Sequence, residues 1–189
     1  MGKNILKAIK KFTLVILTLV IGLVFYHELW SLEYYHLPPI SFVKVEAERT
    51  KLINGIESYQ NIDEFKVFLS RGSFQWEESK DNQPSPKGRP PFNMHTITIK
   101  NYSHLGFSGE LDIGFFNNRL NSSIFYPAEI EKYISALEKE GLKFDNNRKT
   151  IRPPHTRVQI ATDYKGRKYV KWSDIRLDKE VELWIKRYS

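Results

Sequence analysis

The stretch FTLVILTLVIGLVFY, Phe12–Tyr26, carries no charge, and all but three of its residues are bulky and apolar. A helix that crosses a bilayer needs about 20 mostly apolar residues. Phe12–Tyr26 is short for that purpose, but its continuation to Trp30 brings it into range. The sequence therefore predicts a single transmembrane helix over residues 12–30.

The flanks of this stretch favour an uncleaved signal anchor with its N-terminus in the cytoplasm. Basic residues precede the stretch and aromatic residues follow it, as a positive inner flank and an interfacial aromatic belt would. They are Lys3, Lys7, Lys10 and Lys11 on one side, and Tyr26, Trp30, Tyr34 and Tyr35 on the other. A cleaved signal peptide is the nearest alternative. The bulky segment 27–39, HELWSLEYYHLPP, holds no small-residue cleavage pattern, so the anchor is favoured over a cleaved signal and over a buried helix of a soluble protein.

Three segments follow from this interpretation. We expect a basic cytoplasmic tail over residues 1–11, the anchor over 12–30, and one extracytoplasmic domain, periplasmic or at the outer surface, over 31–189. The net charge is +7, and the first 30 residues supply four lysines and one glutamate, which leaves +4 for the domain. So modest an excess indicates a solvated surface of mixed charge, and we expect no nucleic-acid partner. The absence of cysteine excludes disulfides, thiol catalysis and cysteine-based zinc sites.

Helix signals are clearest at 61–72. Asn61 is a good N-cap and is followed by Glu64 at capping-box spacing, while Gly72 is placed to end the helix. The apolar residues of this segment, Ile62, Phe65, Phe68 and Leu69, fall on one helical face. We expect an amphipathic helix packed on a sheet, preceded by a short strand over residues 40–48.

The next segment is rich in proline. Residues 79–93, SKDNQPSPKGRPPFN, contain four prolines and few apolar side chains, which predicts a long exposed loop. Loops of this length are uncommon in compact domains. We therefore expect this loop to be a candidate surface for a protein partner, whose aromatic groove would accept polyproline segments.

An antiparallel meander is predicted next. Residues 94–100, 109–116 and 120–126 alternate apolar and polar side chains, as strands with one buried face do. Asn117-Asn118 suits a tight hairpin turn, because asparagine tolerates the left-handed backbone that such turns require.

Later segments complete an α+β domain. Pro127 and Gly141 bracket a second helix over residues 128–140, and residues 156–162 and 167–172 read as two strands joined by a turn. The C-terminal segment 178–188 has apolar residues at helical spacing, although it also alternates passably as a strand. We expect one antiparallel sheet of about five strands with two or three packed helices.

No residue carries a recognisable catalytic, cofactor-binding or metal-binding motif. The histidines form no metal-ligand pair at short spacing; they are His27, His36, His95, His104 and His155. Glu110 and Asp112 share one face of a strand and are a possible acid–base pair, but a polar outer strand face explains them more simply. We assign no catalytic, cofactor or metal residues and expect no cofactor.

The segment Lys168–Trp172 is the best local case for binding a nucleic acid or a glycan. Alternation puts Tyr169 and Lys171 on one face, and Lys168, Val170 and Trp172 on the other. One stacked cation and aromatic pair is a weak signal. Aromatic side chains that pack against a helix layer are the favoured explanation.

These observations predict a membrane-anchored, non-enzymatic binding domain. It would act as an accessory, assembly or inhibitor protein through contacts with a protein partner. Two alternatives remain open. One is an envelope hydrolase that acts on glycan or lipid with dispersed carboxylates, and the other is a receptor domain for a small ligand.

Overall fold

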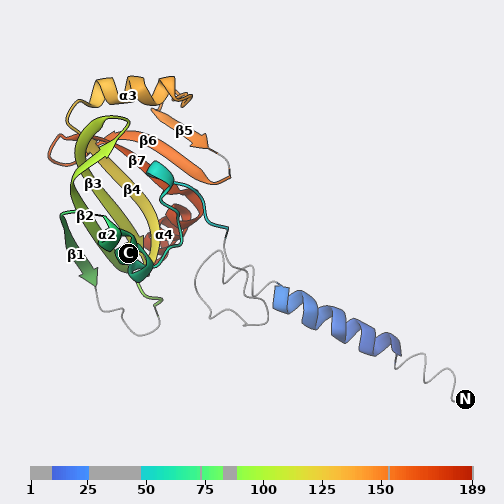
Figure 1. Ribbon diagram of the computed structural model, residues 1–189. Coiled ribbons are helices and arrows are strands. Elements are labelled where there is room, and N and C mark those ends of the chain that lie inside the picture. Colours follow the sequence, from blue (N-terminus) through green and yellow to red (C-terminus); the bar gives the residue numbers. More distant parts are fainter. Residues whose placement is uncertain (1–9, 26–47, 73, 83–88, 153, 189) are drawn as a thin grey trace, which may run out of the picture. The chain divides into compact units, whose positions relative to one another are not determined.

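A computed structural model of the chain describes residues 10–25, 48–72, 74–82, 89–152 and 154–188. The chain divides into two compact units, Met1–Glu46 and Ala47–Ser189. Each unit is drawn in Figure 1. The predicted strand over residues 40–48 lies almost entirely outside the described residues, as do His27 and His36.

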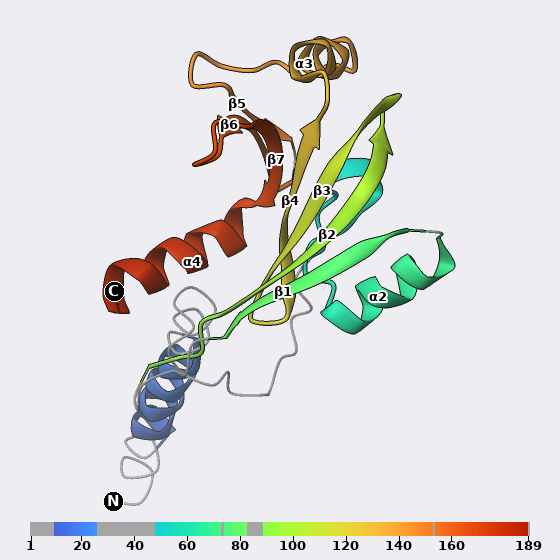
Figure 2. The ribbon, with the colours of Figure 1, turned by 90° about the vertical axis from the view of Figure 1, so that its left-hand side faces the viewer.

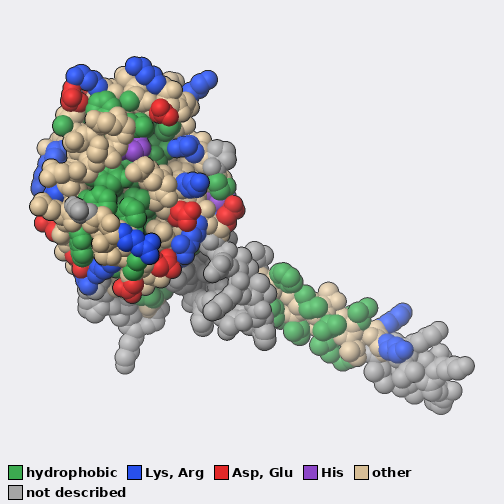
Figure 3. Space-filling model, viewed as in Figure 1, with side chains coloured by type: hydrophobic (Ala, Val, Ile, Leu, Met, Phe, Trp, Pro, Cys, Tyr) green, Lys and Arg blue, Asp and Glu red, His purple; other side chains and the backbone are tan. Residues whose placement is uncertain are grey.

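The first unit contains a helix over residues 10–25. Its apolar side chains are exposed on every side, from Phe12 at 69% to Phe25 at 66%, and Figure 3 shows hydrophobic side chains along its whole length. No helix among the described residues is both long enough and apolar enough to span a bilayer. Residues 26–30, which the predicted span requires, are outside the described part of the chain.

The second unit is an α+β domain built on one seven-stranded antiparallel sheet in the order β1-β2-β3-β4-β7-β6-β5. The strands are β1 (Trp76–Asn82), β2 (Asn93–His104), β3 (Phe107–Phe116), β4 (Arg119–Pro127), β5 (Lys149–Arg152), β6 (Thr156–Thr162) and β7 (Lys168–Asp174). Its helices are the 3-10 turn η1 (Ile53–Gly55), α2 (Ile62–Arg71), α3 (Ile130–Lys139) and α4 (Ile175–Tyr188). Figure 2 shows α2 and α4 on opposite sides of the sheet.

The predicted meander is confirmed as β2-β3-β4. Its second hairpin turns at Asn117-Asn118, where both residues have a left-handed backbone with φ of 47° and 62°. The first hairpin turns at Leu105-Gly106 with φ of 53° and 79°, which is unusual for leucine. These paired positive φ values match the right-handed twist of the flanking strands.

The capping and turn residues of the sequence predicted the ends of the helices to within a few residues of the observed ends. Asn61 caps α2 through its side-chain oxygen, which accepts from the Glu64 amide over 2.9 Å. The Glu64 carboxylate, instead of closing a capping box, accepts from Arg49 over 3.1 Å. The helix expected from residue 128 begins at Ile130, because Pro127 ends β4. The C-terminal segment is helical, and α4 begins at Ile175.

The expectation of about five strands was too low, because both edge strands were missed. Every residue of β1 from Trp76 to Asp81 is exposed, so this strand has no buried face and no apolar alternation. The strand β5 is only four residues long and lies at the other edge. The structure also places Ser79–Asn82, which we expected in the long loop, within β1; residues 83–88 are outside the described part.

The hydrophobic core lies between one face of the sheet and the helices α2 and α3. Phe65 of α2 meets Phe115 of β3 edge-on at 5.8 Å between ring centroids. Tyr133 of α3 packs against Phe125 and Trp172 at 5.1 and 6.4 Å. The opposite face of the sheet therefore remains free to carry polar side chains, and α4 lies over one end of it.

Candidate functional site

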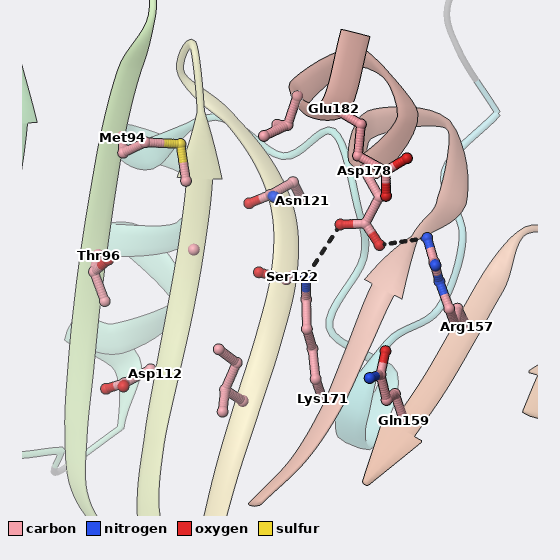
Figure 4. Close-up of a pocket in the computed structure, with 13 residues that line it drawn as sticks. Met94, Thr96, Asp112, Asn121, Ser122, Arg157, Gln159, Lys171, Asp178 and Glu182 are labelled. Atoms are coloured by element: carbon pink, nitrogen blue, oxygen red, sulfur yellow. Dashed lines mark hydrogen bonds and ion pairs between the residues drawn. The ribbon is translucent and has the colours of Figure 1, made fainter. Parts of the chain in front are cut away.

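A cavity of about 410 Å³ lies between the polar face of the sheet and α4. We call it the groove. Its walls come from strands β2, β3, β4, β6 and β7 and from the first turns of α4, so residues far apart in the sequence meet there (Figure 4). A cavity of this size falls in the range of small-molecule sites.

Gly114 of β3 and Ser122 of β4 form part of the groove floor. A Cβ added at Gly114 would lie 2.7 Å from Ser122 Oγ and 3.1 Å from Asn121 Oδ1. A side chain at position 114 would therefore crowd this part of the groove. The predicted strand alternation over residues 109–116 put Gly114 on the polar face, and the structure confirms that placement.

Asn121 owes its position to a β-bulge. Phe115 pairs with Leu120 and Gly114 pairs with Ser122, so Asn121 is an extra residue of β4 that opposes no residue of β3. Bulges of this kind redirect a side chain and are frequent next to functional sites. Here the bulge brings the Asn121 side chain to the groove rather than to the core.

The Asn121 side chain is a buried hydrogen-bond acceptor. Asn121 is only 4% exposed, and its Oδ1 accepts no hydrogen bond from the residues that the structure describes. Figure 4 shows the amide reaching into the space between Met94 and Ser122. Leaving a buried polar atom unpaired carries a free-energy penalty, so Asn121 Oδ1 lowers the stability of the fold relative to a paired acceptor.

An ion-pair cluster fixes the opposite wall. Asp178 in the first turns of α4 accepts from Arg157 of β6 over 2.9 Å and from Lys171 of β7 over 3.2 Å. Ser173 also donates to Asp178. These contacts, two of which are dashed in Figure 4, tie α4 to the sheet and neutralise the Asp178 carboxylate.

Glu110 and Asp112 share the polar face as predicted, but their carboxylates bind different partners. Lys100 and Arg167 bind Glu110 outside the groove, and the hydrogen bond from Lys100 lowers the pKa of Glu110. Asp112 lines the groove and accepts from Thr98 over 2.6 Å. Burial raises the pKa of Asp112 above the ordinary value of an aspartate despite that hydrogen bond.

The described histidines are dispersed. His95 lies 2.6 Å from a Glu78 oxygen, and His104 Nδ1 lies 2.6 Å from the Tyr133 hydroxyl. The backbone oxygen of His155 accepts from Ile175. Within the described ranges, no group of three or more His, Asp or Glu side chains is arranged to hold a metal ion.

The predicted two faces of residues 168–172 are confirmed. Val170 and Trp172 are buried towards the core, and Trp172 packs on Tyr133 of α3. On the other face, Tyr169 packs on Tyr126 at 5.3 Å between ring centroids, and Lys171 binds Asp178 in the groove.

Sequence reasoning singled out Asp112 and Lys171, which line the groove, but it missed most of the other residues that shape it. Asn121, Arg157 and Asp178 come from three elements that meet only in the folded sheet, and none belongs to a local motif. The only relevant sequence signal was the polar face of the alternating strands. It predicts a solvent-exposed sheet face but does not predict where a cavity forms on that face. Comparison with protein-family models and with curated proteins finds no match for this chain.

Proposed function

We propose that this chain is a membrane-anchored, non-enzymatic binding domain that acts as an accessory, assembly or inhibitor protein through contact with a protein partner. In this proposal residues 12–30 span the bilayer, the N-terminus is cytoplasmic and the domain lies outside the cytoplasm. Two features of the chain support it, one in each unit.

The exposed apolar helix over residues 10–25 supports membrane anchoring. A helix that is hydrophobic all round belongs in a protein core or in a membrane. The exposed side chains of this helix make neither a stripe nor a polar face, and two lysines, Lys10 and Lys11, stand at its start. At about 1.5 Å per residue it is about 24 Å long, against about 30 Å for a hydrocarbon core. Residues 26–30 would supply the difference.

The outer edge of β1 supports contact with a protein, and it is the observation that carries this proposal. The β1 strand pairs with β2 on one side, and no strand of the described chain pairs with its other side. Such an edge presents main-chain N–H and C=O groups that an extended segment of a partner can join as a further strand.

Two exposed aromatic side chains lie on β1 and on α2, which an ion pair between Lys66 and Glu78 joins to β1. Trp76 of β1 is 40% exposed and Phe68 of α2 is 43% exposed, although helical spacing had placed Phe68 on the buried stripe. Phe68 stacks on Phe74 at 5.8 Å, and Lys66 lies over the Trp76 ring at 5.9 Å. A partner strand on β1 would cover these rings, and aromatic anchors of this kind dominate protein interfaces.

Site-specific photo-crosslinking tests the proposal. A photoreactive phenylalanine analogue at Phe68 of the full-length chain, expressed in its native membranes, should give one discrete crosslinked product of higher mass. Trp76→Glu in the same chain should weaken that product, because it places a charge where the partner would bury an aromatic ring. Tyr164 is the matched control position, since it is an aromatic residue that is 92% exposed in the β6–β7 turn.

The pattern across positions decides the result. A product from Phe68 and none from Tyr164 supports a specific partner at the β1 edge. Equal products from both positions, or none from Phe68 at native expression, would count against the proposal.

A further inference from the structure

Most of the excess positive charge of the domain lies in one short segment. The first 30 residues take +3 of the total net charge of +7, which leaves +4 for residues 31–189. Residues 143–152, KFDNNRKTIR, hold four basic side chains and one acidic side chain, a net charge of +3. We call residues 143–152 the basic segment. It comprises β5 and the loop that precedes this strand.

The cations of the basic segment are not neutralised by the rest of the described chain. They are Lys143, Arg148, Lys149 and Arg152, of which only Lys149 is half-buried and the others are exposed. No ion pair within the described residues involves any of them. Neighbouring cations are paired instead, since Arg157 binds Asp178 and Lys168 binds Glu131. The positive charge of the basic segment is therefore open to an anionic partner.

Hydrogen bonds hold the basic segment in one conformation. Asp145 Oδ1 accepts from the main-chain amides of Asn147 and Lys149, each over 2.8 Å, and the Asp145 amide donates to the Lys149 carbonyl over 2.8 Å. The Arg148 carbonyl accepts from the Ile160 amide of β6 over 3.0 Å. The single carboxylate of the segment is thus bound by the main chain, and an ordered backbone presents the cations. Such ordering lowers the entropy cost of binding.

An exposed apolar side chain lies among these cations. Ile151 is 57% exposed and belongs to β5, which forms one edge of the sheet (Figure 1). Strand alternation places Lys149 on the same face of β5 as Ile151, and Arg152 on the other face. Binding to the interface of an anionic bilayer increases with buried apolar area and with the attraction of cations to lipid headgroups. The basic segment offers both.

A lipid surface fits the basic segment better than a nucleic acid does. Proteins that bind single-stranded nucleic acid stack bases on exposed aromatic side chains. The one aromatic residue of the segment, Phe144, packs against the hydrophobic core instead. The apolar side chain that the segment exposes is aliphatic, and an aliphatic side chain is suited to the acyl boundary of a bilayer.

We propose that the basic segment binds a surface of anionic phospholipid, with its four cations at the headgroup phosphates and Ile151 at the acyl boundary. This inference rests on the membrane anchor of the proposed function, because a tethered domain meets the bilayer at a high effective concentration and a weak contact is then sufficient. The contact uses the β5 edge of the sheet. It leaves the β1 edge, at the other end of the strand order, for a protein partner.

Single fluorescent labels on the full-length chain test this contact. The chain has no cysteine, so Ile151→Cys carries one environment-sensitive nitrobenzoxadiazole group. Ser79→Cys carries the same group on β1 as the matched control, since Ser79 is exposed at the opposite edge of the sheet. Each protein would be placed in nanodiscs of phosphatidylcholine alone, or of equal parts of phosphatidylcholine and phosphatidylglycerol.

The label at Ile151 should gain intensity and shift to shorter wavelength only in the anionic nanodiscs, and the label at Ser79 should respond in neither. The response should fade as NaCl rises from about 0.1 M to about 1 M, because the Debye length falls from about 10 Å to about 3 Å.

Charge variants identify the cations that carry the contact. A lysine or arginine near an anionic surface changes the binding constant about fivefold, so Lys149→Gln combined with Arg152→Gln should weaken the contact about 25-fold. Most of the fluorescence response should then be lost. Arg71→Gln combined with Lys165→Gln removes the same charge from exposed positions outside the basic segment, and it should leave the response unchanged.

Failure of this contact is distinguishable from failure of the anchor. A chain without an anchor would enter neither kind of nanodisc, as size-exclusion chromatography would show. Adding the labelled chain to preformed vesicles of the same two compositions would then test the basic segment by itself. The inference would be overturned by no response at Ile151, by equal responses in both lipids or at both labels, or by a response that survives Lys149→Gln with Arg152→Gln.

Discussion

Arg176 donates two side-chain hydrogen bonds to the carboxylate of Asp174 at the junction of β7 and α4. Nε donates to Oδ1 over 3.0 Å and Nη2 donates to Oδ2 over 2.6 Å. Asp174 is fully buried, and Ser58 donates to the same Oδ2 over 2.8 Å. The Asp174 carboxylate at the end of β7 thus binds both Ser58, in the segment before α2, and Arg176 of α4.

Removal of this charge should destabilise the domain. Asp174→Asn would remove the charge that Arg176 pairs with, while the Glu48 carbonyl still accepts from the Arg176 guanidinium. Because hydrogen bonds to charged groups contribute about 1.5–3 kcal/mol each, we expect a loss of about 2 kcal/mol of unfolding free energy. Urea unfolding of the full-length protein in detergent, followed by tryptophan fluorescence, measures the loss. The exposed pair Lys168–Glu131 is the control, since solvent screens such a pair and Lys168→Met should cost much less than Asp174→Asn. Equal costs for the two variants would contradict the central role of Asp174.

The same carboxylate predicts an acid-dependent part of stability. Burial acts to raise the pKa of Asp174, but hydrogen bonds from Arg176 and Ser58 outweigh burial and lower the pKa below its ordinary value. The unfolded chain, with an aspartate pKa of about 4, therefore binds this proton first as the pH falls. The stabilisation is full above about pH 4 and is lost as the pH falls through the folded pKa. The difference in unfolding free energy between wild type and Asp174→Asn should shrink from pH 6 to pH 3. A constant difference over this range would contradict the prediction that an ionised Asp174 carboxylate stabilises the folded protein.

His104 predicts a second pH dependence at higher pH. Burial lowers the pKa of His104, whose Nδ1 lies against the Tyr133 hydroxyl. Because the unfolded histidine has a pKa of about 6.5, lowering the pH below that value protonates the unfolded chain first and reduces stability. His104→Gln should flatten the decline in unfolding free energy between pH 7.5 and pH 5. Part of the decline should remain, since burial also lowers the pKa of His95. Identical slopes for variant and wild type would exclude His104 as a source.

Asn121→Leu should leave the domain as stable as the wild type or make it more stable by up to about 1 kcal/mol. The substitution removes an unpaired buried acceptor, and replacing such an atom with apolar surface is not a loss. Thr156→Val is the matched comparison. Thr156 is equally buried, but its hydroxyl meets Thr50 Oγ1 and the Lys51 carbonyl, each at 2.8 Å. That variant should lose about 1 kcal/mol in urea unfolding. A larger loss for Asn121→Leu than for Thr156→Val would show that Asn121 is satisfied in solution.

Membrane attachment gives a direct fractionation experiment. If residues 12–30 form the anchor, the full-length chain should stay with the membrane pellet in alkaline carbonate and require detergent for release. A variant without residues 1–30 should move to the supernatant, because the apolar helix is then absent. Full-length protein with its first residues intact in the detergent-free supernatant would end the anchor hypothesis.

Sequence patterns located the parts of the fold whose signals are local. Asn61 satisfies an amide within its own helix turn, and Asn117-Asn118 closes a hairpin between adjacent strands. Both depend on residues a few positions apart, so the residues themselves specify the geometry. The alternation of 94–100, 109–116 and 120–126 likewise reflects one buried face.

The strands β1 and β5 gave no such signal, because an edge strand need not bury a face. Residues of β1 are exposed on both sides, and their charges resemble those of a loop. Only main-chain pairing with β2, at residues 93–99, makes them a strand.

The sequence by itself determined an apolar segment near the N-terminus, an α+β domain after it, and the faces that its central strands bury, because hydrophobic periodicity and turn residues act over short distances. Tertiary structure alone decided the groove. Asn121 reaches the groove through a one-residue offset between β3 and β4, and Arg157, Lys171 and Asp178 meet because β6, β7 and α4 pack together. Such a register shift and such packing are set by long-range pairing, which no local pattern of residues records.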